Sequence, residues 1–220
     1  MKYSVQTGAH GAYIQTYASF LENVVEGFRV GKTSLLLVKV VNEKGVEHRY
    51  YSHYGGGTGK LNVAVPSWLT DKGEKIHVFF KVVSDEEFIQ SVPEIVVDGG
   101  ENQPQLVIEK LALEEGVLRL MVKQGSVSRL LKARSPVVGF DPRGVEITEG
   151  RYAGAPYVQF TLGDKTLRIY FNHGKTRIAL GSGRNYYTVK SMQLLDTQLK
   201  TVIQKKGKEI RLVSSNISLD

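Results

Sequence analysis

Alternation of apolar and polar residues recurs along most of this chain and predicts β-strands. In the first part, Ser34–Val41 and Val46–His53 flank a short turn and predict a β-hairpin. Lys60–Val65 and Lys75–Val83 also alternate, and Pro66 ends the first of these two runs. We therefore expect a compact, barrel-like β subdomain in this part of the chain.

The second half of the chain predicts a run of antiparallel hairpins that form a meander. The expected strands are Leu106–Leu113, Val117–Val122, Val137–Phe140, Val145–Tyr152, Tyr157–Leu162, Thr166–His173, Lys175–Leu180 and Lys208–Ser214. In Tyr157–Leu162 and Thr166–His173, the apolar residues share one face and the polar, basic and aromatic residues share the other. We expect such a sheet to bury the first face and to expose the second to water.

Two segments repeat apolar residues at the three- to four-residue spacing of an amphipathic helix. Tyr13–Phe28 predicts an N-terminal helix, and Ser191–Lys205 predicts a C-terminal helix through Met192, Leu195 and Leu199. Together with the strands, these helices predict an α+β fold that is rich in β-structure.

The segment from Asp98 to Pro104, DGGENQP, has the composition of a linker. The charge balance changes at the same place. Residues 1–98 carry 10 Lys and Arg against 11 Asp and Glu, whereas residues 99–220 carry 19 against 11. We therefore predict two subdomains, a helix plus barrel-like β subdomain over 1–98 and a basic antiparallel β subdomain over 99–220.

Composition excludes several classes of site. The 220 residues include no cysteine, which excludes disulfides, thiol catalysis and cysteine-type zinc sites, and this absence together with abundant Lys, Glu and Val is typical of a thermophile. His48 and His53 fall on opposite faces of their predicted strand, so we expect no metal site there and no cofactor. No apolar run reaches the length of a membrane span or of a signal peptide. We expect a cytoplasmic protein with no membrane partner.

The basic second half predicts a polyanionic partner. Between Lys165 and Arg211 the chain has eleven Lys and Arg and two acidic residues. Lysine and arginine position phosphates, and tyrosines among them can stack on bases. The candidate nucleic-acid-binding residues are Arg168, Tyr170, Asn172, Lys175, Arg177, Arg184 and Tyr186. We expect a nucleic-acid-binding protein, with DNA favoured over RNA, and we leave monomer and homodimer open.

Two alternatives to a binding protein stay open. Glu47, Tyr51 and His53 share one face of a predicted strand with Arg49, and these residue types suit general acid–base work and phosphate binding. They make a metal-independent enzyme acting on nucleic acid, a nuclease or a base-removing enzyme, the first alternative. The second is a structural or assembly protein whose basic surface is a solvated sheet face.

The stretch LNVAVPSWLTDKGEKIHVFF lies within Lys60–Val82 and reads as strand, proline, short helix, Gly-Glu and strand. It resembles the repeating element of AbrB-like swapped-hairpin transcription regulators, which read as strand, Ile-Pro, short helix, Gly-Asp and strand. The resemblance covers these residues alone. It implies a compact barrel and DNA binding, and it identifies no binding residue.

Overall fold

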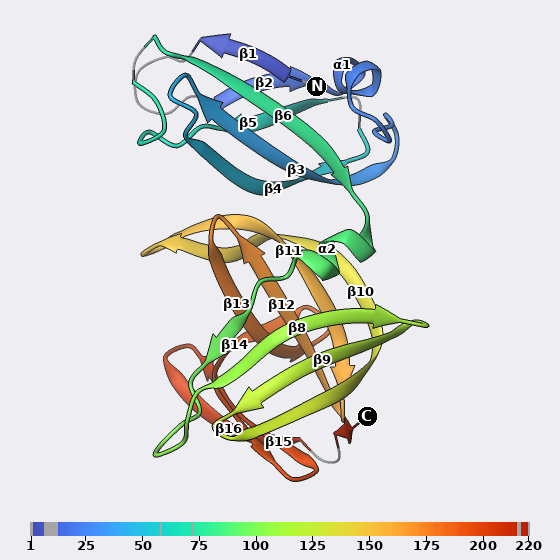
Figure 1. Ribbon diagram of the computed structural model, residues 1–220, viewed down its shortest axis with the longest axis vertical. Helices are drawn as coiled ribbons and strands as arrows, with labels where there is room; N and C mark the ends of the chain where they lie inside the picture. Colours follow the sequence, from blue (N-terminus) through green and yellow to red (C-terminus); the bar gives the residue numbers. More distant parts are fainter. Residues whose placement is uncertain (1, 7–12, 58, 72, 215–216, 220) are drawn as a thin grey trace. The chain divides into compact units, whose positions relative to one another are not determined.

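The computed structural model describes residues 2–6, 13–57, 59–71, 73–214 and 217–219 (Figure 1). The protein is β-rich, as predicted, with 66% of its residues in strands and two short helices among the described residues. It divides into two compact units. The first comprises Met1–Ser84 with Asn172–Gly174, and the second comprises Asp85–Phe171 with Lys175–Asp220. The division thus falls at Ser84, before the boundary predicted at Asp98.

The first unit contains two small antiparallel sheets that share one core. One sheet has the order β1-β6-β3-β4, and the other pairs β2 with β5. Their bounds are β1 (Lys2–Gln6), β2 (Tyr13–Tyr17), β3 (Thr33–Asn42), β4 (Glu47–Gly55), β5 (Lys60–Ala64) and β6 (Lys75–Val83). Apolar residues of both sheets pack in a single cluster that includes Val38, Val63 and Val78. The predicted hairpin is confirmed, because β3 pairs with β4 without a register shift.

The predicted N-terminal helix is wrong over its first part. Tyr13–Tyr17 forms β2, and the helix α1 extends only over Ala18–Val24. Aromatic and β-branched residues such as Ile14 and Thr16 favour a strand once a partner strand is present, and β5 supplies that partner. Within α1 the predicted apolar face of the helix is buried, because Ala18 and Leu21 are fully buried.

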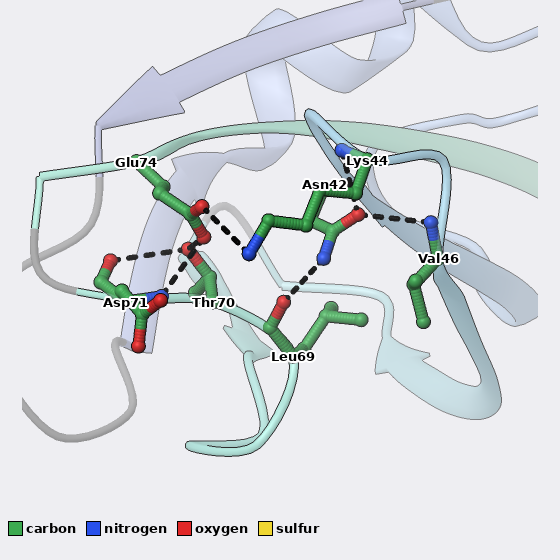
Figure 2. A network of polar contacts seen from close by, with 7 residues as sticks. All are labelled: Asn42, Lys44, Val46, Leu69, Thr70, Asp71 and Glu74. Atoms are coloured by element: carbon green, nitrogen blue, oxygen red, sulfur yellow. Dashed lines mark hydrogen bonds and ion pairs between the residues drawn. The ribbon is translucent and has the colours of Figure 1, made fainter.

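A buried asparagine organises the turns of the first unit (Figure 2). Asn42 is 6% exposed, and its Nδ2 donates to the Leu69 carbonyl at 2.7 Å. Its Oδ1 accepts from the backbone N–H groups of Lys44 at 3.0 Å and Val46 at 2.8 Å. One side chain therefore satisfies the β3–β4 turn and ties it to the loop that follows Pro66.

Glu74 closes the far end of that loop. Its Oε2 accepts from the Asp71 N–H and from Thr70 Oγ1, both at 2.9 Å, and Lys44 Nζ lies 3.7 Å from Oε1 (Figure 2). The hydrogen bonds from Asp71 and Thr70 favour the ionised carboxylate and lower the pKa of Glu74.

The second unit is built on ten antiparallel strands that curl into a half-barrel. The strands follow the chain in order from β7 to β16, and β17 pairs with β10. The elements are α2 (Asp85–Ser91), β7 (Ile95–Val97), β8 (Leu106–Glu114), β9 (Val117–Gln124), β10 (Val127–Thr148), β11 (Arg151–Leu162), β12 (Lys165–Asn172), β13 (Lys175–Ser182), β14 (Asn185–Leu195), β15 (Gln198–Lys205), β16 (Lys208–Ser214) and β17 (Ser218–Leu219). The predicted antiparallel meander is confirmed, but the predicted division into Val137–Phe140 and Val145–Tyr152 is wrong. The strand β10 continues through Asp141–Gly144 with a shift of register, and the turn to β11 lies at Glu149 and Gly150.

The predicted C-terminal helix is wrong. Ser191–Lys205 contains the end of β14, a turn and all of β15, and the two strands pair with Leu194 opposite Leu199. The turn places Asp196 at a positive φ of 33°. Thr201, Val202 and Ile203 are β-branched, which favours a strand over a helix. The same apolar residues therefore fit a hairpin.

The half-barrel buries the apolar face of its strands, as the alternation predicts. Val158 pairs with Ile169 and Phe160 with Leu167, and all four side chains are at most 1% exposed. The residues between them point to the opposite face of the sheet. That face carries most of the predicted binding residues.

Candidate nucleic-acid interface

The registers of β11 with β12 and of β13 through β16 define two parts of one surface, which we call the polar face. The contact of Arg177 on β13 with the Tyr170 ring on β12 joins the two parts. Tyr157 lies opposite Tyr170, and Gln159 lies opposite Arg168. The same face continues over the next four strands through the alternation within each of them. Its side chains are Tyr157, Gln159, Arg168, Tyr170, Arg177, Tyr186, Thr188, Lys200, Val202, Gln204, Glu209 and Arg211.

Arg168 is the most constrained cation on the polar face. Its guanidinium carbon lies 4.0 Å from the ring centre of Tyr157 and 3.6 Å from that of Tyr186. Its Nε donates to Gln159 Oε1 at 2.9 Å, and its Nη1 donates to the Tyr170 hydroxyl at 3.3 Å. Stacking between two rings fixes the guanidinium plane and leaves its charge in place. Arg168 is therefore held ready for an anion.

Small residues on β13 make this stack possible. Arg168 is on β12 and Tyr186 is on β14, with β13 between them. On that intervening strand the polar face carries Ala179 and Gly181, which add little or no side chain above the sheet. Gly181 is also required locally, because an added Cβ would lie 1.9 Å from the Asn185 carbonyl oxygen.

Tyr170 belongs to the polar face but is fully buried. Val145, Ala155 and Ala179 form a small apolar cluster with it, so the polar face is not wholly open to water as we expected. Burial raises the pKa of the Tyr170 hydroxyl, against the opposing effect of its hydrogen bond from Arg168. The neutral hydroxyl donates to Asp141 Oδ2 at 3.4 Å. Tyr170 is thus placed to position Arg168 and not to stack on a base.

Arg177 covers the ring of Tyr170, with its guanidinium carbon 4.3 Å from the ring centre. Its Nε is buried and has no hydrogen-bond partner among the described residues. A second guanidinium therefore lies against the same tyrosine that binds Arg168.

The other predicted binding residues lie elsewhere. Asn172 belongs to the first unit and is 2% exposed. Its Oδ1 accepts from the Tyr51 N–H at 2.6 Å, and its Nδ2 donates to the Tyr51 carbonyl at 2.8 Å. Lys175 is exposed at the start of β13, and Arg184 is exposed in the turn before β14. The structure therefore brings Arg168, Arg177 and the two neighbouring tyrosines together and leaves these three apart.

Several residues of this site were missing from the predicted set. Tyr157 and Gln159 are detectable from the alternation of their strand, because they fall on the same face as Arg168. Asp141 was not detectable, since its contact with Tyr170 spans 29 residues and joins β10 to β12, which are not neighbours in the sheet.

The predicted catalytic residues do not converge. In the regular strand β4, Glu47 and His53 are about 20 Å apart, because a strand rises about 3.3 Å per residue. The Glu47 carboxylate pairs with Arg49 at 2.7 Å and with Lys39 at 4.0 Å. Tyr51 is 9% exposed, and burial lowers the pKa of His53. One substrate bond cannot reach Glu47 and His53 together.

The first unit also contains a cluster of aromatic and imidazole rings that the sequence pattern does not predict. His48 Nε2 lies 3.1 Å from His173 Nδ1, and the His173 ring stacks on Tyr50 with centroids 4.9 Å apart. Trp68 contacts His48 edge-on at 5.5 Å. Burial and then the charge of His48 lower the pKa of His173 to about 4, and burial lowers the pKa of His48. Both imidazoles are therefore neutral at pH 7.

Comparison with protein-family models, with curated proteins and with solved structures finds no match to this chain. Within the part of the chain that the structure describes, no three His, Asp or Glu side chains are placed to hold a metal ion. Neither described helix is long and apolar enough to cross a membrane.

Proposed function

We propose that this protein binds nucleic acid through the polar face of its second unit. The observation that carries the proposal is the arrangement of Arg168, whose guanidinium is stacked between Tyr157 and Tyr186 and oriented by Gln159. A preorganised guanidinium binds a phosphate with less loss of conformational entropy than a free side chain does.

The distribution of charge along the face supports a polymeric anion. Arg168, Arg177, Lys200 and Arg211 lie on β12, β13, β15 and β16, and Glu209 is the carboxylate of this face. Adjacent strands are about 4.8 Å apart, so these cations extend over about 19 Å along the sheet. Several phosphates of one chain can contact such a row, and each contact releases counterions.

DNA is the partner we propose first, because the resemblance of Lys60–Val82 to the AbrB-like element implies DNA binding. The same resemblance favours a barrel-like arrangement of the first unit. In that unit β5 and β6, the two strands of the element, belong to different sheets around the shared core.

The test is the binding of labelled single-stranded and duplex DNA and RNA, measured by fluorescence anisotropy over a series of salt concentrations. Arg168→Ala should weaken binding about tenfold and reduce the salt slope by about one. Arg168→Lys should keep most of the salt slope and lose affinity, because it keeps the charge and loses the stacked plane.

Arg119→Ala is the matched control, since Arg119 pairs with Glu114 at 2.6 Å on the β8–β9 hairpin. It should bind like the parent protein. Thermal melting of each variant separates lost contacts from lost folding. Parent-like binding by Arg168→Ala and Arg177→Ala at every salt concentration would remove the polar face from consideration.

A further inference from the structure

A hollow of about 670 Å³ opens in the second unit between the segment Asp98–Gln103 and strands β14, β15 and β16. Its walls carry three cations, Lys190, Lys200 and Arg211, and three carboxylates, Asp98, Glu101 and Glu209. Small-molecule sites in proteins commonly have volumes of about 300 to 1,000 Å³, so the hollow is of suitable size.

The loop that forms one wall is anchored, although its composition predicts a linker. The Met192 N–H donates to the Asp98 carbonyl at 2.8 Å, and the Gly100 N–H donates to Asp98 Oδ1 at 2.7 Å. An added Cβ on Gly99 would lie 2.0 Å from the Pro104 carbonyl oxygen. Glycine therefore permits a tight loop that is fastened to β14.

Gln124 holds the other end of the loop. This side chain is 7% exposed, and its Nε2 donates to the Pro104 carbonyl at 2.9 Å and to the Met192 carbonyl at 3.3 Å. Its Oε1 accepts from the Leu194 N–H at 2.8 Å. One buried amide thus joins the end of the loop at Pro104 to β14. A wall braced in this way is formed before any ligand binds.

A β-bulge turns an additional cation into the hollow. The register of β14 with β15 shifts between Val189 and Ser191, which leaves Lys190 as the extra residue. Neighbouring residues of a regular strand point to opposite faces, yet Lys190 and Ser191 both line the hollow. Bulges re-aim side chains in this manner, and they are frequent beside functional sites.

The cations of the hollow are not neutralised by its carboxylates. Across the described residues, Lys190, Lys200 and Arg211 form no ion pair with a carboxylate, and all three are at least partly exposed. Cations without carboxylate partners attract an anion. The three carboxylates beside them accept hydrogen bonds from hydroxyl groups.

We propose that the hollow binds a phosphorylated sugar. Lys190, Lys200 and Arg211 bind the phosphate through charge-assisted hydrogen bonds, and Glu101 and Glu209 accept hydrogen bonds from the sugar hydroxyls. The mixed charge of the walls matches a ligand that is anionic at one end and rich in hydroxyl donors at the other. The ligand is a free sugar phosphate or the ribose phosphate of a nucleotide. The hollow includes Lys200, Val202, Glu209 and Arg211 of the polar face, so ribose 5-phosphate should compete with nucleic acid there. Arg168 lies outside the hollow, so the Arg168→Ala variant separates failure of one proposal from failure of the other.

The test is isothermal titration calorimetry of the full chain with ribose 5-phosphate, and with ribose and inorganic phosphate as the two fragments of that probe. Ribose 5-phosphate should bind at least tenfold more tightly than either fragment. Arg211→Ala should weaken its binding at least tenfold, and Glu101→Gln should weaken ribose 5-phosphate while leaving inorganic phosphate unchanged. Arg119→Ala and Arg168→Ala are the controls outside the hollow, and both should bind ribose 5-phosphate like the parent.

Adenosine 5′-monophosphate distinguishes the two sources. Affinity equal to or above that of ribose 5-phosphate identifies a nucleotide, and much weaker binding identifies a free sugar phosphate. The proposal is overturned if neither compound binds at millimolar concentration, if inorganic phosphate binds as tightly as ribose 5-phosphate, or if a folded Arg211→Ala variant binds like the parent. Because Arg211 is exposed, its replacement should leave the thermal melt unchanged.

Discussion

The β3–β4 hairpin of the first unit and the polar face of the second unit differ in the partners of their positive charges. In the first unit Arg49 and Lys39 pair with Glu47, and Lys44 pairs with Glu74. On the polar face of the second unit, Arg168 and Arg177 lie against tyrosine rings. A cation paired with a carboxylate is neutralised, whereas a cation stacked on a ring keeps its charge and most of its donors. The partners of the cations, more than their number, therefore identify the surface that can bind an anion.

The two units also differ in what fixes their local structure. The exposed ion pairs of the first unit contribute little to stability, since such pairs are worth about 0 to 1 kcal/mol. Its turns depend instead on the buried amide of Asn42. In the second unit the charged side chains themselves are part of the packed structure. Substitutions in each unit should therefore have effects of different kinds.

Charge reversal should show the largest contrast. The double variant Arg168→Glu, Arg177→Glu should lower nucleic-acid affinity about 1,000-fold, because each arginine contributes about 1 to 3 kcal/mol and each glutamate adds repulsion. Lys39→Glu, Arg49→Glu in the first unit should change it less than about threefold, since these cations are already neutralised. Anisotropy titrations at one salt concentration measure both. Equal losses from the two pairs would contradict the comparison.

Removing the Asn42 amide should destabilise the first unit by about 3 kcal/mol, because one buried and two partly buried hydrogen bonds are lost at about 1 kcal/mol each. Hydrogen exchange of the β3 and β4 amides in Asn42→Ala measures the loss. The β12 amides serve as the internal reference and should not change. Asn62→Ala, at an exposed position of β5, is the matched control. Unchanged protection in β3 would show that the turn does not depend on this side chain.

The pH dependence of folding that arises from histidine should be confined to the first unit, between about pH 6.5 and 4. All five histidines fall within the residue ranges of that unit. The pKa of His173 is lowered to about 4 from 6.5. As the pH falls through 6.5, the unfolded chain binds a proton that folded His173 does not, so stability decreases until the pH nears 4 and then levels off.

Urea unfolding at a series of pH values, followed by circular dichroism, measures this profile. His173→Gln should flatten it, because the substituted side chain binds no proton in either state. A variant profile as steep as that of the parent would assign the pH dependence to other groups, of which His48 is the nearest.

The smallest effect is expected at the ion pairs of the first unit. Lys44→Ala should change the free energy of unfolding by less than about 0.5 kcal/mol, and salt should reduce even that. Arg168→Ala should cost about 1 to 2 kcal/mol with little dependence on salt, because it loses two ring contacts and two hydrogen bonds. Urea unfolding at low and high salt compares the two. Similar losses with the same salt dependence would remove the distinction between the units.

The strands were predictable from the sequence where one face is buried. Val158, Phe160 and Leu162 alternate with polar residues, and only a strand puts all three in one core. The segment Ser191–Lys205 was wrongly predicted as a helix, because the spacing of its apolar residues fits both the 3.6-residue period of a helix and the two-residue period of a strand. Leu195, which a helix would bury, is 38% exposed in the hairpin.

The candidate sites were predictable only in part. Residue type and alternation identify Arg168 and Arg177, because the charge of each residue and the face on which it lies follow from its own strand alone. The partners of these arginines come from other strands. The local sequence pattern predicts neither the hydrogen bond between Tyr170 and Asp141 nor the contact of Arg168 with Tyr186 across β13. The Asp98–Pro104 segment has a linker composition, and the residue that anchors it, Gln124, lies 20 positions from Pro104.

Trp68 provides a spectroscopic label that the protein already contains. It is the single tryptophan of the chain, it lies in the first unit, and its indole is 64% exposed beside His48. Excitation at the red edge of the indole band, where tyrosine does not absorb, therefore reports on one unit alone. A solvated indole already emits at long wavelength when the protein is folded. Unfolding removes the neighbouring imidazole, so it should change the intensity and lifetime of the emission more than the wavelength of the emission maximum.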